Sequence, residues 1–461
     1  MTKPTPVPEK LALLGGPTSV DAALHQRWPH LGAAEKAAVL GALDGVLDRG
    51  VLSGHLAPEV RALEREFAAY LGVKYAIATN SGTAALHIAL AAAGIGPGDE
   101  VITPAFSFVA GGLSVLHQNA VPVFVDIEPE SFGMDPALIE AAITPRTRAL
   151  MPVHMHGLAC DLSPMLAIAK RHGLVVIEDA CQAHGATLEG RKVGTFGALG
   201  AFSLQASKNL ACGEGGICVT DDEQLYLRAS SARMFGEDIQ PKDEQNYRIE
   251  RALDGNRAYD SKGMGWMYRT NELSAAVART QLRGLPASNE NGRQNAELLM
   301  QRLRGLPGVQ PPRIPPGRES VYHKYRVRLD AAQLGVSAPP TVVRDVVLQA
   351  LVAEGVEAVL WQTKPVPAQT LFREKKGYGR RRDADPEAPG CPWDHSAPVS
   401  YALAQYPQTQ ALLDSSLCLF SQTFPIYGQP RTLAAQYAEA FAKVWLQLPE
   451  LLAQRDAGTA R

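Results

Sequence analysis

The hydrophobic positions of this chain follow two periods that alternate between residues 70 and 220. Short apolar runs rich in β-branched residues are typical of strands, and the segments between them repeat apolar residues every three or four positions, as helices do. Runs such as LVVI are apolar on both faces, so the pattern predicts an α/β fold with a mostly parallel sheet covered by helices. The predicted strands are KYAIATN (74–80), EVITPA (100–105), VPVFVDI (121–127), RALMPVH (148–154), LVVIEDA (174–180), ALGAFSL (198–204) and GGICVTD (215–221).

The pattern changes after NELSAAVARTQLRGL (271–285), a predicted helix that Asn271 is expected to cap. Prolines cluster in residues 306–317, and a strand-like YHKYRVRL (322–329) and a helix-like VVRDVVLQALVAEG (342–355) follow. We therefore predict three parts: an N-terminal arm (1–30), a large domain (31–285) and a smaller C-terminal α/β domain (286–461) with a long loop at about 363–410.

Composition and charge narrow the classes of partner. The 461 residues are 46% hydrophobic and 20% charged, which is ordinary for a globular protein. Since 45 Lys and Arg stand against 47 Asp and Glu, charge gives no reason to expect a nucleic-acid or membrane-surface partner. The six cysteines form no CxxC pair, the N-terminus has no apolar signal region, and no run of 18 apolar residues occurs. These features predict a cytoplasmic protein with reduced thiols and a small ligand.

Candidate chemistry gathers where predicted strands end, because ligands of open parallel sheets bind at that edge. The Ser81–Thr83 turn joins a strand to a helix, where N–H groups can hold an anion, although the same residues also make an ordinary helix cap. Asp179 ends a strand too apolar to leave a carboxylate unpaired. Lys208 lies in SLQASKNLACGEGG (203–216), and a desolvated lysine amine has a lowered pKa and becomes a nucleophile.

One cofactor needs all three groups together. Pyridoxal 5′-phosphate (PLP) requires a cradle for its phosphate, a carboxylate beside its ring nitrogen and a lysine that forms a Schiff base with its aldehyde. Two other patterns are weaker. His154 and His156 alternate along one strand without a carboxylate or thiol at ligand spacing, so no metal site is expected. The Arg380–Arg382 run could contact a substrate diphosphate, but a charge run in a loop is more often solvated.

The chain also resembles the DegT/DnrJ/EryC1/StrS family of PLP-dependent sugar and cyclitol aminotransferases, in its glutamine:scyllo-inosose aminotransferase and aminohydroxybenzoate synthase branch. The resemblance is strong from about residue 50 to 285. It rests on EREFAAYLGVKYAIATNSGTAALHIALAAAGIGPGDEVITPAFSFVA (64–110), PVHMHG (152–157), VIEDACQAHGA (176–186), FSLQASKNLACGEGG (202–216) and GWMYRTNELSAAVARTQL (265–282). It implies a fold type I, aspartate aminotransferase-like architecture and a homodimer with sites at the interface.

The resemblance implies a role for each site residue. Lys208 matches the aldimine lysine, Asp179 matches the acid that pairs with the pyridine nitrogen, and Gln182 matches the residue near the phenolic oxygen. A side chain in the Glu214–Gly216 turn is expected to crowd the cofactor. The other cofactor-binding positions are Phe108, which matches the aromatic that stacks on the ring, and the phosphate cradle of Ser81, Gly82, Thr83 and Ser203.

One position departs from the family pattern. The family's GYNYR reads GWMYR here, so Met267 replaces an asparagine that reaches the cofactor phosphate of the neighbouring subunit. A thioether donates no hydrogen bond. Arg269 and Asn271 follow closely, and we expect Arg269 to supply the missing donor.

The implied reaction transfers the amino group of glutamate or glutamine to a nucleotide-linked keto-sugar or to a keto-cyclitol, through the Lys208 aldimine. A PLP-dependent dehydratase or aromatising enzyme of the same family is an alternative, but dehydrating relatives replace the lysine. A cofactor-binding regulator without enzyme activity is another, but no DNA-binding segment supports it.

Overall fold

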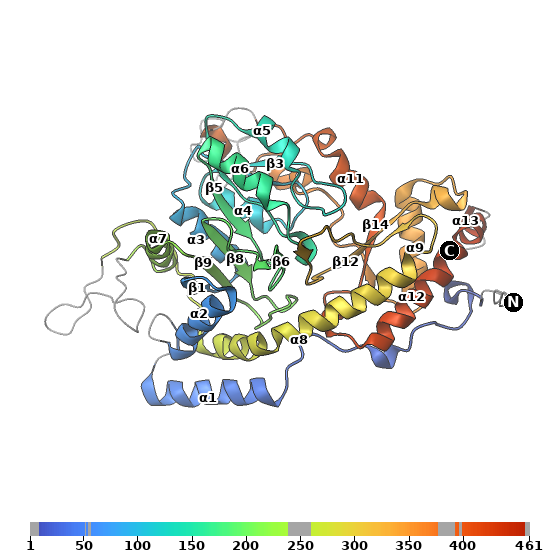
Figure 1. Ribbon diagram of the computed structural model, residues 1–461, viewed down its shortest axis with the longest axis horizontal. Coiled ribbons are helices and arrows are strands. Elements are labelled where there is room, and N and C mark those ends of the chain that lie inside the picture. Colours follow the sequence, from blue (N-terminus) through green and yellow to red (C-terminus); the bar gives the residue numbers. More distant parts are fainter. Residues whose placement is uncertain are drawn as a thin grey trace.

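The computed structural model describes residues 9–50, 52–53, 57–237, 260–376, 392–395 and 399–456. Within these ranges, all seven runs predicted as strands join one central sheet (Figure 1). β9 pairs antiparallel with β1 and β8, whereas the remaining pairs are parallel, so the predicted mostly parallel α/β sheet is confirmed. The order β1-β9-β8-β5-β4-β2-β3 comprises β1 (Tyr75–Thr79), β2 (Glu100–Pro104), β3 (Val121–Val125), β4 (Thr147–Leu150), β5 (Val175–Asp179), β8 (Leu199–Ser203) and β9 (Gly216–Thr220).

Helices cover both faces of this sheet because successive strand side chains point to opposite sides. Val176 packs into one apolar cluster and Ile177 into the other. One cluster is covered by α2 (Pro58–Leu71), α5 (Ile139–Ala142), α6 (Leu162–His172) and the first half of α8 (Glu272–Leu303). The other is covered by α3 (Gly82–Ala92), α4 (Ala110–His117) and α7 (Glu223–Arg233).

Helix α8 is longer than the sequence pattern indicates. Asn271 caps it as predicted, since its side chain accepts a hydrogen bond from the Ser274 N–H, but the helix continues through Pro286 to Leu303. Proline removes one helical hydrogen bond, yet apolar packing on both sides of Pro286 holds the helix together. The boundary expected at 285 therefore falls inside a helix, and α1 (Ala33–Arg49) lies along the first half of α8 (Figure 1).

A second, antiparallel sheet lies beside the C-terminal half of α8. Its order is β10-β12-β14-β13, with β10 (Val309–Gln310), β12 (Tyr325–Leu329), β13 (Ala358–Val359) and β14 (Ser416–Leu419). Helices α9 (Pro340–Ala353), α12 (Arg431–Leu446) and α13 (Leu448–Asp456) contribute to its apolar core. Leu11 and Val20 also join this core, so the segment expected to be an arm packs against the second sheet.

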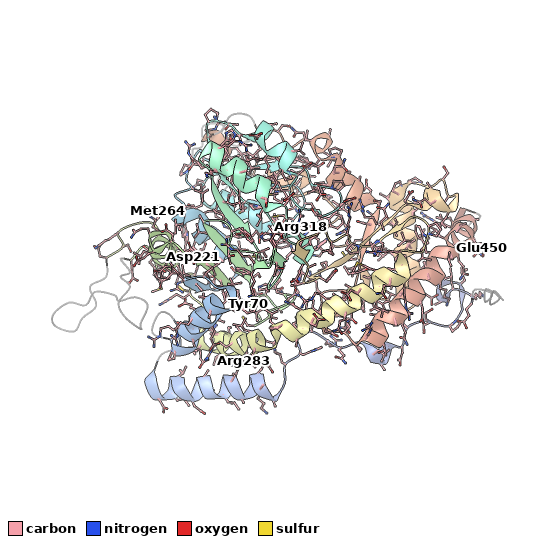
Figure 2. The ribbon with its side chains drawn as sticks, viewed as in Figure 1. Tyr70, Asp221, Met264, Arg283, Arg318 and Glu450 are labelled. Carbon is pink, nitrogen blue, oxygen red and sulfur yellow. The ribbon has the colours of Figure 1, made fainter. Side chains whose placement is uncertain are left out.

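The two sheets are joined at the carboxyl edge of the central sheet. β11 (Arg318–Glu319) pairs with β6 (Thr187–Leu188), which pairs with β7 (Arg191–Lys192). The Arg318 guanidinium, labelled in Figure 2, lies 3.3 Å from the Asp161 carboxylate. The Val321 N–H donates to the Gly157 carbonyl, so the chain enters β12 directly beside the ends of the central strands.

The expected long loop at 363–410 is described only in part. Its described residues include α10 (Thr370–Arg373) and the start of α11 (Pro407–Asp414). Its apolar side chains pack with Phe124 of β3 and not with the second sheet, as shown by Val366, Phe372 and Tyr401. Arg380–Arg382 lie outside the described residues. No helix in the described ranges is both long and apolar enough to cross a bilayer.

Candidate active site

Asp179 is a nearly fully buried carboxylate at the carboxyl end of β5. Its Oδ1 atom accepts a hydrogen bond from the Cys181 N–H at 3.1 Å. Burial raises the pKa of this carboxyl group, while the Cys181 hydrogen bond and the positive charges of Lys208 and His154 oppose the rise. This carboxyl group is therefore held in apolar surroundings and lies within electrostatic reach of a lysine.

Lys208 lies in a loop and not at the end of a strand as expected. β8 ends at Ser203, and the loop to β9 is held by hydrogen bonds from the Leu204 N–H to the Gly215 carbonyl and from the Ala206 N–H to the Gly213 carbonyl. Burial lowers the pKa of Lys208, and the neighbouring acidic groups of Cys181 and Asp179 oppose this effect. A lysine with a lowered pKa supplies more neutral amine, which is the nucleophilic form.

The Ser81–Thr83 turn meets the end of β8 closely. Ser81 caps α3 by accepting a hydrogen bond from the Ala84 N–H at 3.1 Å. A Cβ atom at Gly82 would lie 2.6 Å from the Ser203 Cβ, and one at Gly216 would lie 2.2 Å from the Ser81 carbonyl oxygen. A side chain at position 216 would therefore collide with the backbone of Ser81. From the sequence, we instead expected a side chain in this turn to crowd the cofactor.

Gln182 and the segment around Met267 approach the same edge. The Gln182 Oε1 atom accepts the His156 N–H at 3.1 Å, and its amide nitrogen has no partner among the described residues. The Asn80 N–H donates to the Tyr268 carbonyl, so Met267 and Arg269 lie close to the Ser81–Thr83 turn. The Arg269 Nε atom is buried without a hydrogen-bond partner in the described chain.

Phe108 is exposed at the carboxyl edge of the sheet, in contrast to Phe106. Its side chain is 54% exposed, whereas Phe106 is buried against Phe132, His156 and Trp361. An exposed ring at this edge has a free face on which a second ring can stack.

A buried hydrogen-bonded pair next to Asp179, formed by His154 and Glu178, was not predicted from the sequence. The Glu178 carboxylate accepts three backbone N–H groups, from Gly194, Phe196 and Gly197, and lies 2.9 Å from the His154 Nε2 atom. Burial alone would lower the pKa of His154, but Cys160 and Glu178 raise it to about 10. Both a carboxylate and a thiol therefore reach His154, contrary to the spacing argument. Still, no group of three or more His, Cys, Asp or Glu side chains in the described ranges could hold a metal.

Two buried cations were also missed. Lys324 and Arg326 lie at the start of β12, next to His156. Their spacing of two in the strand-like YHKYRVRL places both on one strand face, and this signal was present in the sequence.

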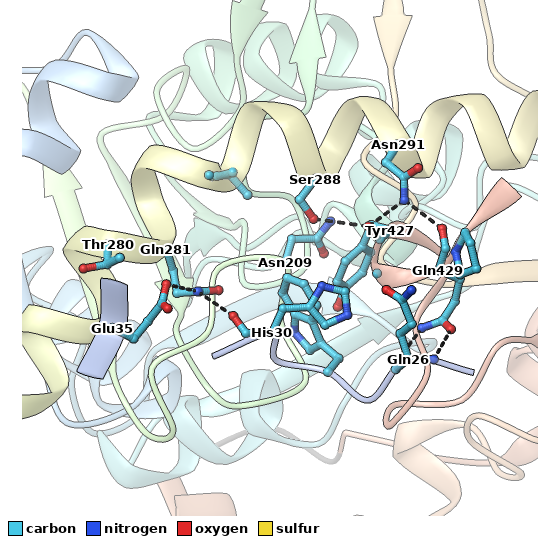
Figure 3. A pocket seen from close by; sticks show the side chains of 15 residues that line it. Gln26, His30, Glu35, Asn209, Thr280, Gln281, Ser288, Asn291, Tyr427 and Gln429 are labelled. Carbon is cyan, nitrogen blue, oxygen red and sulfur yellow. Dashed lines mark hydrogen bonds between the residues drawn. The ribbon is translucent and has the colours of Figure 1, made fainter. Parts of the chain in front are cut away.

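A cavity of about 410 Å³ lies behind the Lys208 loop (Figure 3). Trp28 and Tyr427, which line it, donate hydrogen bonds to the backbone carbonyls of Lys208 and Ser207 at 3.0 and 2.8 Å. Asn209 faces the cavity and donates to the Asn289 side chain and to the Val321 carbonyl. These contacts hold the lysine loop in place from the side of α8.

Comparison with known proteins agrees with this geometry. A model of the DegT/DnrJ/EryC1/StrS aminotransferase family matches residues 34–388. The UDP-N-acetyl-3-dehydro-alpha-D-glucosamine 3-aminotransferase of Acidithiobacillus ferrooxidans is 39% identical over 313 residues, which cover 68% of this chain and 76% of that protein. The L-glutamine:scyllo-inosose aminotransferase of Streptomyces griseus is 41% identical over 335 residues, with coverage of 71% and 76%.

A solved structure is similar over nearly its whole length. The S. venezuelae DesV structure in complex with a ketimine intermediate superposes with a TM-score of 0.72 at 32% identity, covering 91% of this chain and 99% of that chain. The family match spans well over half of the sequence and includes every candidate residue described above. This chain is therefore an aminotransferase of the DegT/DnrJ/EryC1/StrS family.

Proposed function

We propose that the chain transfers an amino group from glutamine or glutamate to a keto-sugar or keto-cyclitol, with PLP bound at the carboxyl edge of the central sheet. The observation that carries this proposal is the meeting of Asp179, Lys208 and the Ser81–Thr83 turn at that edge. The named relatives support the substrate classes, since one is a glutamine-dependent cyclitol aminotransferase and another acts on a UDP-linked sugar.

The residues present fit the cofactor. The N-terminus of α3 and the Ser81 hydroxyl offer donors to a phosphate, and Gly82 lets the turn lie directly against Ser203. The Asp179 carboxylate is buried and no cation of the described residues contacts it, which leaves it available to a protonated ring nitrogen. The Gln182 amide nitrogen is available for the ring oxygen, and Phe108 has a free face for stacking.

Each of these residues then has a task in the transfer. When bound, PLP supplies an aldehyde that carries the amino group and a ring that accepts electrons. The Lys208 amine would hold the cofactor at its aldehyde carbon. Once a donor has displaced it, the free amine would take up the proton of the donor's α-carbon and release it to the cofactor carbon on the other side of the nitrogen. The Asp179 carboxylate keeps a proton on the ring nitrogen throughout.

We further propose that the working unit is a homodimer. Leu40, Leu43 and Leu47 form an apolar stripe on α1, spaced by three and four residues, and Leu47 is 77% exposed. Met267 is also 49% exposed, close to the Ser81–Thr83 turn. Apolar surface of this kind marks a protein interface, and a second copy is the partner that the family resemblance implies.

In this dimer Arg269 replaces the family's asparagine as a phosphate ligand of the neighbouring site. Met267 cannot donate a hydrogen bond, whereas the Arg269 Nε–H is buried without an acceptor in its own described chain. A guanidinium is well suited to a phosphate because its donors form a rigid fork.

The proposed reaction can be followed without knowing the acceptor. Adding L-glutamine or L-glutamate to the purified holoenzyme should bleach the absorbance of the aldehyde form, and a keto-sugar or keto-cyclitol should restore it. Lys208→Ala should show neither change, while the exposed control variant Lys170→Ala should behave as wild type. A holoenzyme that responds to no amino acid would contradict the proposal.

The phosphate turn can be tested by filling the space at Gly82. Gly82→Ala forces a methyl group against Ser203, so we expect the dissociation constant for PLP to rise by about 10- to 100-fold. Gly41→Ala is the matched control, because a Cβ atom at that helical position meets nothing within 4 Å. Titration of the apoenzyme measures both. Equal PLP affinity in the two variants would remove the turn from the cofactor site.

Subunit complementation tests the dimer and Arg269 together. Arg269→Ala should weaken PLP binding, and Lys208→Ala should be inactive. Refolding the two variants as a mixture creates mixed dimers. In each mixed dimer, one site has Lys208 from one chain and Arg269 from the other, so activity at limiting PLP should return. Met267→Asn alone should change PLP affinity little. Absence of recovery in verified mixed dimers would show that Arg269 does not serve the neighbouring site.

A further inference from the structure

Two cations are buried beside the proposed active site without a counter-ion. Lys324 is 3% exposed and Arg326 is 1% exposed, and both lie at the start of β12. In the part of the chain that the structure describes, neither residue forms an ion pair with an aspartate or glutamate. Buried lysine and arginine side chains are rare unless paired, so this arrangement needs an explanation.

Arg326 is held by neutral groups. Its Nε–H donates to the His156 Nε2 atom at 3.0 Å, one terminal nitrogen donates to the Ser416 hydroxyl at 2.7 Å, and the other donates to the Trp361 carbonyl. Its guanidinium also lies over the Phe106 ring. Burial and the charges of Arg326 and Lys324 lower the pKa of His156, so this histidine accepts the hydrogen bond as a neutral ring. The contacts fix the position of Arg326 but leave its charge uncompensated.

Lys324 has even fewer partners. Its backbone N–H donates to the His156 carbonyl, but its ammonium group has no hydrogen-bond partner among the described residues. Burial, with the positive charges of Lys208 and Arg326, lowers the pKa of Lys324 to about 8. No aspartate or glutamate of the described chain neutralises this ammonium group, so a bound anion would complete the arrangement.

The sheet order shows which part of the site these cations face. Ser81 follows β1, Lys208 lies between β8 and β9, Asp179 ends β5, and His156 follows β4. Lys324 and Arg326 contact His156, so they lie on the far side of Asp179 from the phosphate turn. An anion bound by these two cations would therefore not be the cofactor phosphate.

We propose that Lys324, with Arg326 behind it, binds the α-carboxylate of the amino-acid donor. This assignment rests on the proposed function. The α-carboxylate is attached to the carbon whose proton Lys208 moves, so it must be buried close to Lys208, and glutamate and glutamine share it. A phosphate on a nucleotide-linked acceptor is several bonds from the keto carbon and can lie in solvent.

The test measures donor binding separately from turnover. 2-Methyl-L-glutamate has the α-carboxylate but no α-hydrogen, so it binds the holoenzyme without completing transfer. Lys324→Met should raise its dissociation constant by about 10- to 100-fold, because a charge-assisted contact is lost. Lys324→Arg should retain most of the affinity, and the exposed variant Lys170→Met should equal wild type.

Two further measurements make the assignment specific. 4-Aminobutanamide, which is glutamine without its α-carboxylate, should react at the same rate in wild type and Lys324→Met. The KM of the keto acceptor should not change either. The melting temperature of Lys324→Met should not fall, since an unpaired buried charge is removed; if this variant fails to fold, Lys324→Gln takes its place.

Unchanged binding of 2-methyl-L-glutamate in Lys324→Met would overturn the assignment. A raised KM for the keto acceptor in Lys324→Met, with unchanged donor binding, would also overturn the assignment and would show that these cations bind the acceptor. A wild-type holoenzyme that binds 2-methyl-L-glutamate through Lys324 but transfers no amino group would instead contradict the proposed function, so the two failures are distinguishable.

Discussion

The charge balance around Asp179 is the constraint on which the rest of the site depends. Burial at the end of β5 raises the pKa of this carboxyl group, and Lys208 and His154 oppose the rise. The same burial lowers the pKa of Lys208, and Asp179 opposes that change. An acid and an amine that share a buried site in this way are ready for a ligand that brings its own positive and negative groups.

The surrounding fold maintains that balance. Glu178 is fixed by three backbone N–H groups and stabilises charge on His154, which in turn faces Asp179. On the other side, Trp28 and Tyr427 hold the backbone of the lysine loop. The excess positive charge then lies at Lys324 and Arg326, where we propose that the donor carboxylate binds. The second sheet therefore contributes to the site through β12 as well as supporting α8.

The sequence predicted the central sheet well because each strand is a short apolar run with a clear boundary, as LVVIEDA shows. It also placed Asp179, Lys208 and the Ser81–Thr83 turn at one edge, since the rule for parallel sheets needs only strand ends. The length of α8 was not predictable, because a proline such as Pro286 usually ends a helix. Here the helix continues because residues on both sides of Pro286 pack into the two apolar clusters. The His154–Glu178 contact joins residues far apart in sequence, so spacing alone could not reveal it. The spacing of Lys324 and Arg326 was visible in the sequence, but their burial against His156 depends on long-range packing.

The most direct measurement asks which lysine bonds to the cofactor, because the site contains two buried lysines with lowered pKa values, Lys208 and Lys324. Reducing the holoenzyme with borohydride fixes PLP to the lysine that holds it, and peptide mass spectrometry then locates the modified residue. We expect the added mass on Lys208 alone. Modification of Lys324, or of any other lysine in place of Lys208, would contradict it.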